Sequence, residues 1–421
     1  MKLDASSTER ELNAVATQPA LALQTSPRGA VDRRNDQTMS VDSSVWLLAI
    51  ANGAGHVRAA SNIARALEAA GNSTAEVIEI SRYMTRSMRL THITAYLWLV
   101  RRAPAVWAWI DRLQKRRPTT SPPWYYRRGC RALFARARVA RPRALVATEV
   151  GCCEIAALIK RDLALRCPLI AVNPCYDADR AWVQPEVDLY CVATDELRAE
   201  LIARGAAPSS VAAWGVPLDP RFDLNLARGE AKRRVCAQLN LAPELPLLLV
   251  AGGSEGLGLD EILDQALRHL PRAQFIVLAG RHARIKAACE RLVGEQRWRV
   301  RVLGWTDDLW PLLRAADLAL SKLGNFFDEA LAAELPIVAP LPPPGSERVQ
   351  HRLLNRWGVG CGVHTAREAA LAAAQMLAAP TKLESARHAC RRHRRMLAAS
   401  SLAAWITAAL ARHTEGALSS Q

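Results

Sequence analysis

Several features that mark common protein classes are missing from this sequence of 421 residues. Its ten cysteines include no C-x-x-C pair and no metal-ligand spacing, which argues against a zinc site or a thioredoxin-like redox site. No apolar run reaches the roughly 18–20 residues that a membrane-spanning helix needs. The N-terminus also lacks the apolar segment of a secretory signal peptide. We therefore expect a cytoplasmic protein with reduced thiols and no helix across a membrane.

Acidic residues are almost missing from one long stretch. Between positions 82 and 143, Asp111 is the only acid against sixteen Arg and Lys residues, so this stretch carries +15 of the chain's net charge of +16. We call residues 82–143 the basic-aromatic segment and expect it to be helical, with breaks at Pro104 and at 118–123. Large aromatic rings beside cations suit the interface of an anionic membrane. We predict membrane contact through six of its residues: Trp98, Arg101, Arg102, Trp107, Trp109 and Trp124.

Two other interpretations of the basic-aromatic segment stay open. Basic and aromatic side chains also bind nucleic acid, but no RNA- or DNA-binding motif accompanies them, so nucleic acid is the weaker interpretation. The segment is otherwise a solvated basic face of ordinary helices. Aliphatic neighbours such as Leu99, Val106 and Ile110 favour lipid. Elsewhere, five tryptophans are expected in the core: Trp46, Trp182, Trp214, Trp298 and Trp357.

Two distant parts of the chain share one pattern. Apolar stretches at 45–50 and 245–251 each lead into a glycine-rich turn and then a helix-like stretch. Glycines let the backbone turn sharply near a ligand, and the free N–H groups of a helix start favour an anion. Neither turn has the G-x-G-x-x-G spacing of a dinucleotide site. Alternating strands and helices elsewhere predict an α/β protein with two Rossmann-like, doubly wound domains facing a cleft.

The expected organisation has four parts. Residues 1–40 are polar and aperiodic, which predicts a disordered leader, and Met39 is an alternative start. An N-terminal domain follows at 41–226, a C-terminal domain at 227–380 and a helical segment at 381–421.

The order of several motifs resembles one enzyme family. Residues 303–322 read LGWTDDLWPLLRAADLALSK, and residues 329–347 read EALAAELPIVAPLPPPGSE. Four other motifs agree: GAGHVRAA at 53–60, DLYCVATDELRAELIARG at 188–205, GVPLDPRF at 215–222 and AGGSEGLG at 251–258. Together they resemble the monogalactosyl- or monoglucosyldiacylglycerol synthase branch of the family 28 inverting glycosyltransferases. The resemblance implies a GT-B fold, with a UDP-sugar on the C-terminal domain and a lipid acceptor on the N-terminal, membrane-docking domain.

The resemblance also assigns donor-binding residues. Trp305 is expected to place its backbone against the uracil, Glu329 to bind the ribose hydroxyls and Glu347 to lie near the sugar. Lys322 either pairs with phosphate or is solvated. Four residues of one loop are expected to cradle the diphosphate through backbone amides, without a metal ion: Gly252, Gly253, Ser254 and Gly256.

Inverting transfer needs a base that takes the proton of the acceptor hydroxyl. His56 stands at the first glycine-rich turn, and an unperturbed imidazole titrates near neutral pH, so His56 is the first candidate. The alternative is a histidine that caps or packs at the helix start. Asp177 and Asp179 are second candidates; their spacing resembles a metal-binding motif, but we predict no metal. A strand is predicted at 144–148, and the next helix is predicted to begin at Glu154. Glu149 and Glu154 lie near this strand end, where ligands collect in open sheets, yet burial or helix capping explains them equally well.

The sequence therefore predicts an enzyme that transfers a hexose from a UDP-sugar to diacylglycerol or a related lipid, with inversion and without a cofactor. Its expected partners are the UDP-sugar, the lipid acceptor and an anionic membrane surface at the inner face of the cell membrane. One alternative is transfer of GlcNAc to a polyprenyl-linked acceptor. The other is a non-catalytic membrane- or nucleic-acid-binding protein on a GT-B scaffold. The loop at 321–326, one residue shorter than the family pattern, keeps this last alternative open.

Overall fold

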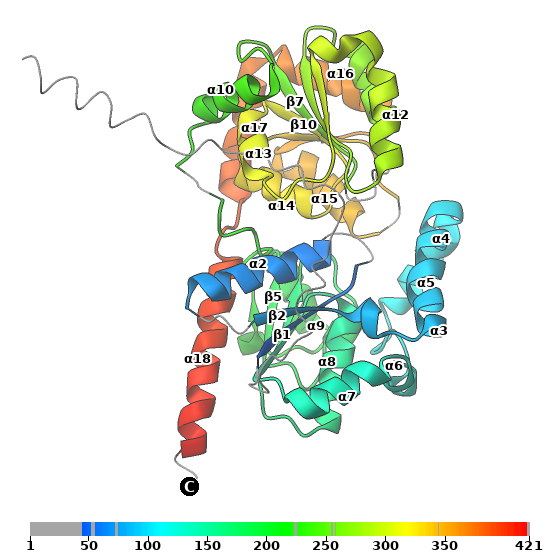
Figure 1. Ribbon diagram of the computed structural model, residues 1–421, viewed down its shortest axis with the longest axis vertical. Helices are drawn as coiled ribbons and strands as arrows, with labels where there is room; N and C mark the ends of the chain where they lie inside the picture. The colour runs from blue at the N-terminus through cyan, green and yellow to red at the C-terminus, as the bar shows by residue number, and fades with distance from the viewer. Residues whose placement is uncertain are drawn as a thin grey trace, which may run out of the picture.

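The computed structural model describes residues 44–51, 55–71, 75–222, 225–253, 256, 258–343 and 345–418. The predicted leader and Ser254 lie outside these residues. Within them the chain forms two α/β domains, which lie one above the other in Figure 1 and confirm the predicted fold class.

Each domain is built on a parallel sheet of six strands, counted over the described residues. The N-terminal sheet has the order β2-β1-β3-β4-β5-β6. Its strands are β1 (Val45–Ala49), β2 (Ala75–Glu79), β3 (Ala144–Ala147), β4 (Leu169–Asn173), β5 (Leu189–Val192) and β6 (Val211–Ala212). The C-terminal sheet has the order β12-β11-β10-β7-β8-β9. Its strands are β7 (Leu247–Ala251), β8 (Gln274–Leu278), β9 (Val300–Leu303), β10 (Leu318–Ser321), β11 (Ile337–Ala339) and β12 (Gly360–Gly362).

Helices cover both faces of each sheet, which is why central strands such as β1 and β7 are continuous apolar runs. In β1, Leu47 packs with α2 (Gly55–Ala69) and α18 (Ala398–Leu418), whereas Leu48 packs toward the opposite face, because side chains alternate along a strand. That opposite face is covered by α7 (Arg131–Ala140), α8 (Val150–Asp162) and α9 (Asp195–Ala203). One face of the C-terminal sheet packs against α11 (Leu259–His269), α12 (Ala283–Val293) and α16 (Ala366–Leu377). The other packs against α10 (Arg228–Leu239), α13 (Trp310–Ala315), α14 (Asn325–Ala332) and α15 (Glu347–Trp357).

The strand orders fix where ligands are expected. In each sheet the chain reverses its direction of winding once, between β1 and β3 in the N-terminal sheet and between β7 and β10 in the C-terminal sheet. Loops after the carboxyl ends of such strands diverge and leave a crevice. His56 and Glu149 lie in or next to the loops after β1 and β3, at the crevice of the N-terminal sheet. Gly252 and Lys322 lie in the loops after β7 and β10, at the crevice of the C-terminal sheet.

The basic-aromatic segment forms a chain of helices between β2 and β3. They are α3 (Arg86–Arg89), the π-helical turn η2 (Leu90–Thr94), α4 (Ala95–Arg102), α5 (Pro104–Gln114), α6 (Pro123–Gly129) and α7. Pro104 and Pro123 begin helices, as predicted, because a first helical residue needs no backbone donor. Figure 1 shows α4 and α5 as a hairpin that projects from the N-terminal domain.

The last helices belong to different domains. The segment expected as one helical unit at 381–421 contains most of α17 (Pro380–His393), which packs against α14 and α16. It also contains α18, which crosses back and packs against α2. At the crossing, Arg395 Nη2 lies 2.5 Å from Asp195 Oδ2 of the N-terminal domain. The N-terminal domain therefore contains residues from two separate parts of the chain, whereas the C-terminal domain is one continuous stretch that ends with α17.

Candidate functional site

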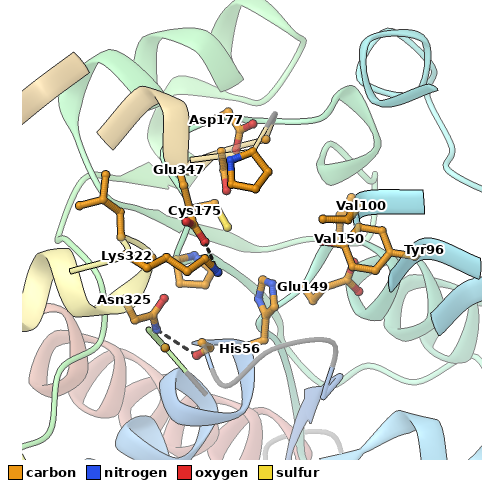
Figure 2. Close-up of a pocket in the computed structure, with 18 of the residues that line it drawn as sticks. His56, Tyr96, Val100, Glu149, Val150, Cys175, Asp177, Lys322, Asn325 and Glu347 are labelled. Carbon is orange, nitrogen blue, oxygen red and sulfur yellow. Dashed lines mark hydrogen bonds and ion pairs between the residues drawn. The ribbon is translucent and has the colours of Figure 1, made fainter. Parts of the chain in front are cut away.

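A cavity of about 770 Å³ lies where the carboxyl ends of the two sheets face each other. Residues of both domains line it, and Figure 2 shows His56, Glu149 and Asp177 from one domain with Lys322, Asn325 and Glu347 from the other. Ligand sites of drug-sized molecules occupy about 300–1,000 Å³, so this space suits one such ligand with part of a second. The candidate site is therefore a shared interdomain cavity.

His56 is the second residue of α2 and lines this cavity. Its Nδ1 atom lies 2.6 Å from the carbonyl oxygen of Thr148, the residue after β3. A carbonyl oxygen only accepts hydrogen bonds, so Nδ1 carries the proton. In the neutral ring Nε2 is then the unprotonated nitrogen, which is the form that a general base needs. The hydrogen bond from Thr148 Oγ1 to the His56 carbonyl, 3.0 Å long, holds the same turn from the other side.

The two second candidates for the base lie on the loop after β4. Asp177 Oδ2 is 2.5 Å from Lys115 Nζ, which also pairs with Asp111, so this carboxylate is already neutralised. Burial raises the pKa of Asp177 despite that ammonium. Burial together with the Asp177 charge raises the pKa of Asp179, which also lines the cavity, to about 7. Within the described ranges, no group of three His, Cys, Asp or Glu side chains is placed to hold a metal ion.

Glu149 and Glu154 have the structural roles that the sequence left open. Glu149 caps α8, because its carboxylate accepts a 2.9 Å hydrogen bond from the backbone N–H of Cys152. Glu154 is buried inside α8 and accepts hydrogen bonds from the Thr120 backbone N–H at 2.9 Å and the Tyr126 hydroxyl at 3.0 Å. Burial raises the pKa of Glu154 to about 7. The helix begins at Val150, four residues earlier than the start predicted at Glu154.

The glycine-rich loop after β7 is tightly folded where the structure describes it. Gly253 and Gly256 have φ values of +70° and +60°, in the left-handed region where a side chain would strain the backbone. A Cβ on Gly252 would lie 2.8 Å from the backbone of Gly256, so the backbone at the start of the loop packs closely against the backbone at Gly256. Gly253 lines the cavity. The loop therefore has the close backbone packing that a phosphate cradle requires, although Ser254 is outside the described residues.

Two carboxylates in the C-terminal half of the cavity are each paired with one cation. Glu347 Oε1 lies 2.9 Å from Lys322 Nζ, and Glu329 Oε1 lies 2.7 Å from Arg58 Nη1. The second oxygen of each carboxylate is buried and has no hydrogen-bond partner among the described residues. Burial raises the pKa of Glu329, with the Arg58 guanidinium opposing it. Both free oxygens are ready to accept hydroxyl donors of a ligand, since such groups are costly to leave unpaired.

Trp305 follows β9 and lines the same half of the cavity. The guanidinium carbons of Arg58 and Arg281 lie 5.1 and 4.0 Å from the centre of its ring. Cations at this range are attracted by the indole face.

The helical hairpin of α4 and α5 has two contrasting faces. Tyr96, Leu99, Val100 and Trp107 line the cavity, and the rings of Tyr96 and Trp107 meet edge to face at 4.8 Å. Burial and the Glu347 carboxylate raise the pKa of Tyr96 to about 12. By contrast, three tryptophans of the basic-aromatic segment are 57–65% exposed: Trp98, Trp109 and Trp124.

The predicted membrane-contact residues are thus divided between two environments. Trp107 lies in the cavity wall rather than on the outer surface, because α5 turns it toward Tyr96. Arg102 is exposed at the end of α4, and the side chain of Arg101 lies outside the described set. One core prediction is wrong: Trp298 is 61% exposed on the C-terminal domain, whereas Trp46 and Trp182 are buried. Trp214 and Trp357 are half-buried.

Three residues in or next to the cavity were missed by the sequence analysis. Arg58 lines the cavity and stands two positions after His56 in the same motif. Thr148, the last residue of a predicted strand, directly follows β3 and accepts the hydrogen bond from His56. Lys115 lies four residues after Asp111, the spacing of a helical ion pair, and this was the signal that could have found it.

Comparison with known proteins finds similarity to one enzyme family. Residues 56–218, which include His56, Lys115 and Asp177, match the family described as Monogalactosyldiacylglycerol (MGDG) synthase. Among similar proteins, the Processive diacylglycerol beta-glucosyltransferase of Bacillus licheniformis is 23% identical over 354 residues, covering 82% of this chain and 89% of that protein. The protein of the same description from Bacillus subtilis is 28% identical over 172 residues, but the match spans only 44% of its length.

Solved structures agree on the architecture. A glycosyltransferase from Rickettsia africae aligns with a TM-score of 0.52 at 12% identity, over 89% of this chain and 97% of that one. A putative UDP-N-acetylglucosamine 2-epimerase from Listeria monocytogenes aligns with a TM-score of 0.55 at 13% identity, over 89% and 98%. At such identities the likeness concerns the fold alone, which a transferase and an epimerase share. The reaction of this protein must therefore be argued from its site.

Proposed function

We propose that this protein transfers a hexose from a UDP-sugar to diacylglycerol or a closely related membrane lipid, with inversion at the anomeric carbon. The observation that carries the proposal is the composition of one cavity. Its C-terminal half has a tight glycine loop and two carboxylates with free buried oxygens. Its N-terminal half has an apolar wall of Leu99, Val100 and Trp107. A polar donor and an apolar acceptor therefore meet in a single space, and names of the relatives, which are diacylglycerol glucosyltransferases, support this pairing.

His56 is the base in this proposal. Its Nε2 accepts the proton of the acceptor hydroxyl while the hydroxyl oxygen forms a bond to the anomeric carbon of the donor sugar. The bond from that carbon to the diphosphate breaks, and its electron pair leaves with UDP. The proton passes from His56 to solvent after transfer. The amides of the glycine loop and the cations of the cavity stabilise the departing charge, so the proposal needs no metal ion.

The acceptor enters along the hairpin of α4 and α5. Its inner face lines the cavity, and its outer face exposes Trp98 and Trp109 beside the excess of arginine. Rings at headgroup level and cations near anionic lipid are typical of reversible docking. No helix that the structure describes combines the length and the apolar character needed to cross a bilayer. We therefore place the protein, as a proposal, on the inner surface of the cell membrane by peripheral contact.

A transfer assay tests the reaction. Purified full-length protein is mixed with diacylglycerol in anionic liposomes and, in parallel, labelled UDP-glucose, UDP-galactose or UDP-GlcNAc, with EDTA present. We expect one hexose donor to give a labelled glycolipid of inverted anomeric configuration, and EDTA to leave the rate unchanged. No glycolipid from any donor would refute the proposal. Product formed only with UDP-GlcNAc and a polyprenyl-linked acceptor would establish the alternative transferase reaction.

Vesicle binding tests the docking surface, and the chain supplies a matched control. Replacing Trp98 and Trp109 together by serine removes two rings that are 60 and 57% exposed, whereas Trp298→Ser removes a ring that is 61% exposed on the other domain. We expect the double variant to sediment with anionic vesicles roughly tenfold more weakly, and Trp298→Ser to bind like wild type. Equal binding by all three proteins would refute the assignment of this surface.

A further inference from the structure

Arg58 belongs to the N-terminal domain, but its side chain lies among residues of the C-terminal domain. It stands in the first turn of α2, and its Nη1 is 2.7 Å from Glu329 Oε1. Its guanidinium carbon is 5.1 Å from the centre of the Trp305 ring. The resemblance assigns these two partners to the nucleoside of the donor. Arg58 therefore reaches across the cavity to the nucleotide position.

In the C-terminal, donor half of the cavity, Arg58 keeps N–H groups that its ion pair does not use. Lys322 and Arg58 balance Glu347 and Glu329, one pair each. A guanidinium has five N–H donors in a planar fork. Within the described part of the chain, the one hydrogen bond of Arg58 is the bond to Glu329. Its side chain is 24% exposed and lines the cavity, so the other N–H groups face space that a ligand can fill.

A diphosphate is the ligand chemistry that fits this capacity. A UDP-sugar adds negative charge to a cavity half whose carboxylates are already matched one to one by cations. Guanidinium groups bind phosphate oxygens through two N–H groups at once, and they stay charged at any physiological pH. The single ammonium of Lys322 is held by Glu347, so of the two cations paired with these carboxylates Arg58 is the one with donors to spare.

We infer that Arg58 is a donor-binding residue which the N-terminal domain contributes to the nucleotide site. One edge of its guanidinium holds Glu329 for the ribose hydroxyls, and its remaining N–H groups donate to diphosphate oxygens. As the bond to the sugar breaks, charge grows on the diphosphate, and a cation in place beforehand stabilises it most. The inference rests on the proposed function, because it takes a UDP-sugar as the ligand.

Comparing UDP with uridine separates contact with phosphate from an indirect effect through Glu329. Affinities are measured by calorimetry for wild type, Arg58→Gln, Arg58→Lys and Arg65→Gln. Arg65 is the matched control, since it lies on the same helix, pairs with Asp219 at 2.8 Å and does not line the cavity. We expect Arg58→Gln to weaken UDP about 10- to 100-fold and uridine less than about threefold, as for the loss of charged hydrogen bonds. Arg65→Gln should leave both affinities unchanged.

Each of the other possible results would overturn this inference, the proposed function or both. Equal weakening of UDP and uridine would overturn the inference, because Arg58 would then act only through Glu329. Unchanged UDP affinity in Arg58→Gln would overturn it as well, while leaving the proposed function intact. Wild type that binds no UDP would refute the proposed function and this inference together. If Arg58→Gln unfolds, Arg58→Lys keeps the charge without the fork; UDP affinity equal to wild type in that variant would overturn the bidentate contact.

Discussion

Replacing His56 by asparagine separates the structural role of this side chain from its proposed role as the base. The imidazole donates from Nδ1 to the Thr148 carbonyl and presents Nε2 to the cavity. An asparagine amide nitrogen reaches about as far as Nδ1, so it keeps the hydrogen bond to Thr148. It has no counterpart of Nε2. The variant therefore removes the proposed base and leaves the local fold in place.

The two contributions differ in size. The retained hydrogen bond is worth about 0.5–1.5 kcal/mol of stability, which His56→Ala would lose and His56→Asn would keep. General-base catalysis contributes about 10²- to 10⁴-fold, or roughly 3–5 kcal/mol of activation free energy. We expect His56→Asn to have the unfolding temperature and UDP affinity of wild type, with kcat lower by about 10²-fold or more.

The assay is glycolipid formation at saturating donor, with Asp179→Asn as the competing variant. Asp179 also lines the cavity, and its pKa of about 7 makes its carboxylate the form that accumulates above neutral pH. If Asp179 were the base, activity would rise through pH 7 and Asp179→Asn would abolish it. A kcat of His56→Asn within about threefold of wild type would refute the assignment of His56.

Three further changes test other parts of the structure. Glu154→Gln should make the free energy of unfolding less dependent on pH. Burial raises the pKa of Glu154 from 4.5 to about 7, so the wild-type protein loses stability as this carboxyl group ionises. Urea denaturation should show the wild-type free energy of unfolding falling by about 3 kcal/mol relative to the variant between about pH 4 and pH 8. Gly256→Ala places a Cβ 2.7 Å from Ile285 Cγ2 at a φ of +60°, so calorimetry should show weaker UDP binding, and thermal unfolding a loss of at least about 1 kcal/mol. Tyr176→Phe removes a 2.7 Å interdomain hydrogen bond to the buried Asp328, which should cost about 1–3 kcal/mol in urea denaturation; an unchanged midpoint would contradict this reasoning.

The sequence was most informative where signals are local. The apolar stretches predicted at 45–50 and 245–251 contain β1 and β7, because a central strand covered on both faces must be apolar throughout. The start of α8 was placed too late, since Glu149 caps the helix and is not among the strongest capping residues. Motif residues next to strand ends could be brought together in advance, because parallel strands share one carboxyl edge.

Contacts between the domains could not be predicted in the same way. Arg58 and Glu329 are separated by 271 positions, and no local pattern states that their helices face each other. The same limit explains Trp107 and Trp298. Trp107 stands in an apolar stretch that was predicted to contact a membrane, but α5 turns it into the cavity. Trp298 was predicted in the core, but it lies exposed at the end of a short 3-10 helix. Burial of a single ring depends on the neighbour that covers it.

The path of α18 has a consequence for how the protein is made. Its residues Leu402, Ile406 and Leu410 pack in the same cluster as β1 and α2, which are synthesised first. During translation, the part of this face of the N-terminal sheet and of α2 that α18 later covers therefore stays exposed until the whole C-terminal domain has been made, with an apolar surface open to other chains. A fragment that stops at residue 397 should aggregate or need a chaperone, although it contains every residue of the cavity. Expression and protein engineering should treat these last turns as part of the first domain.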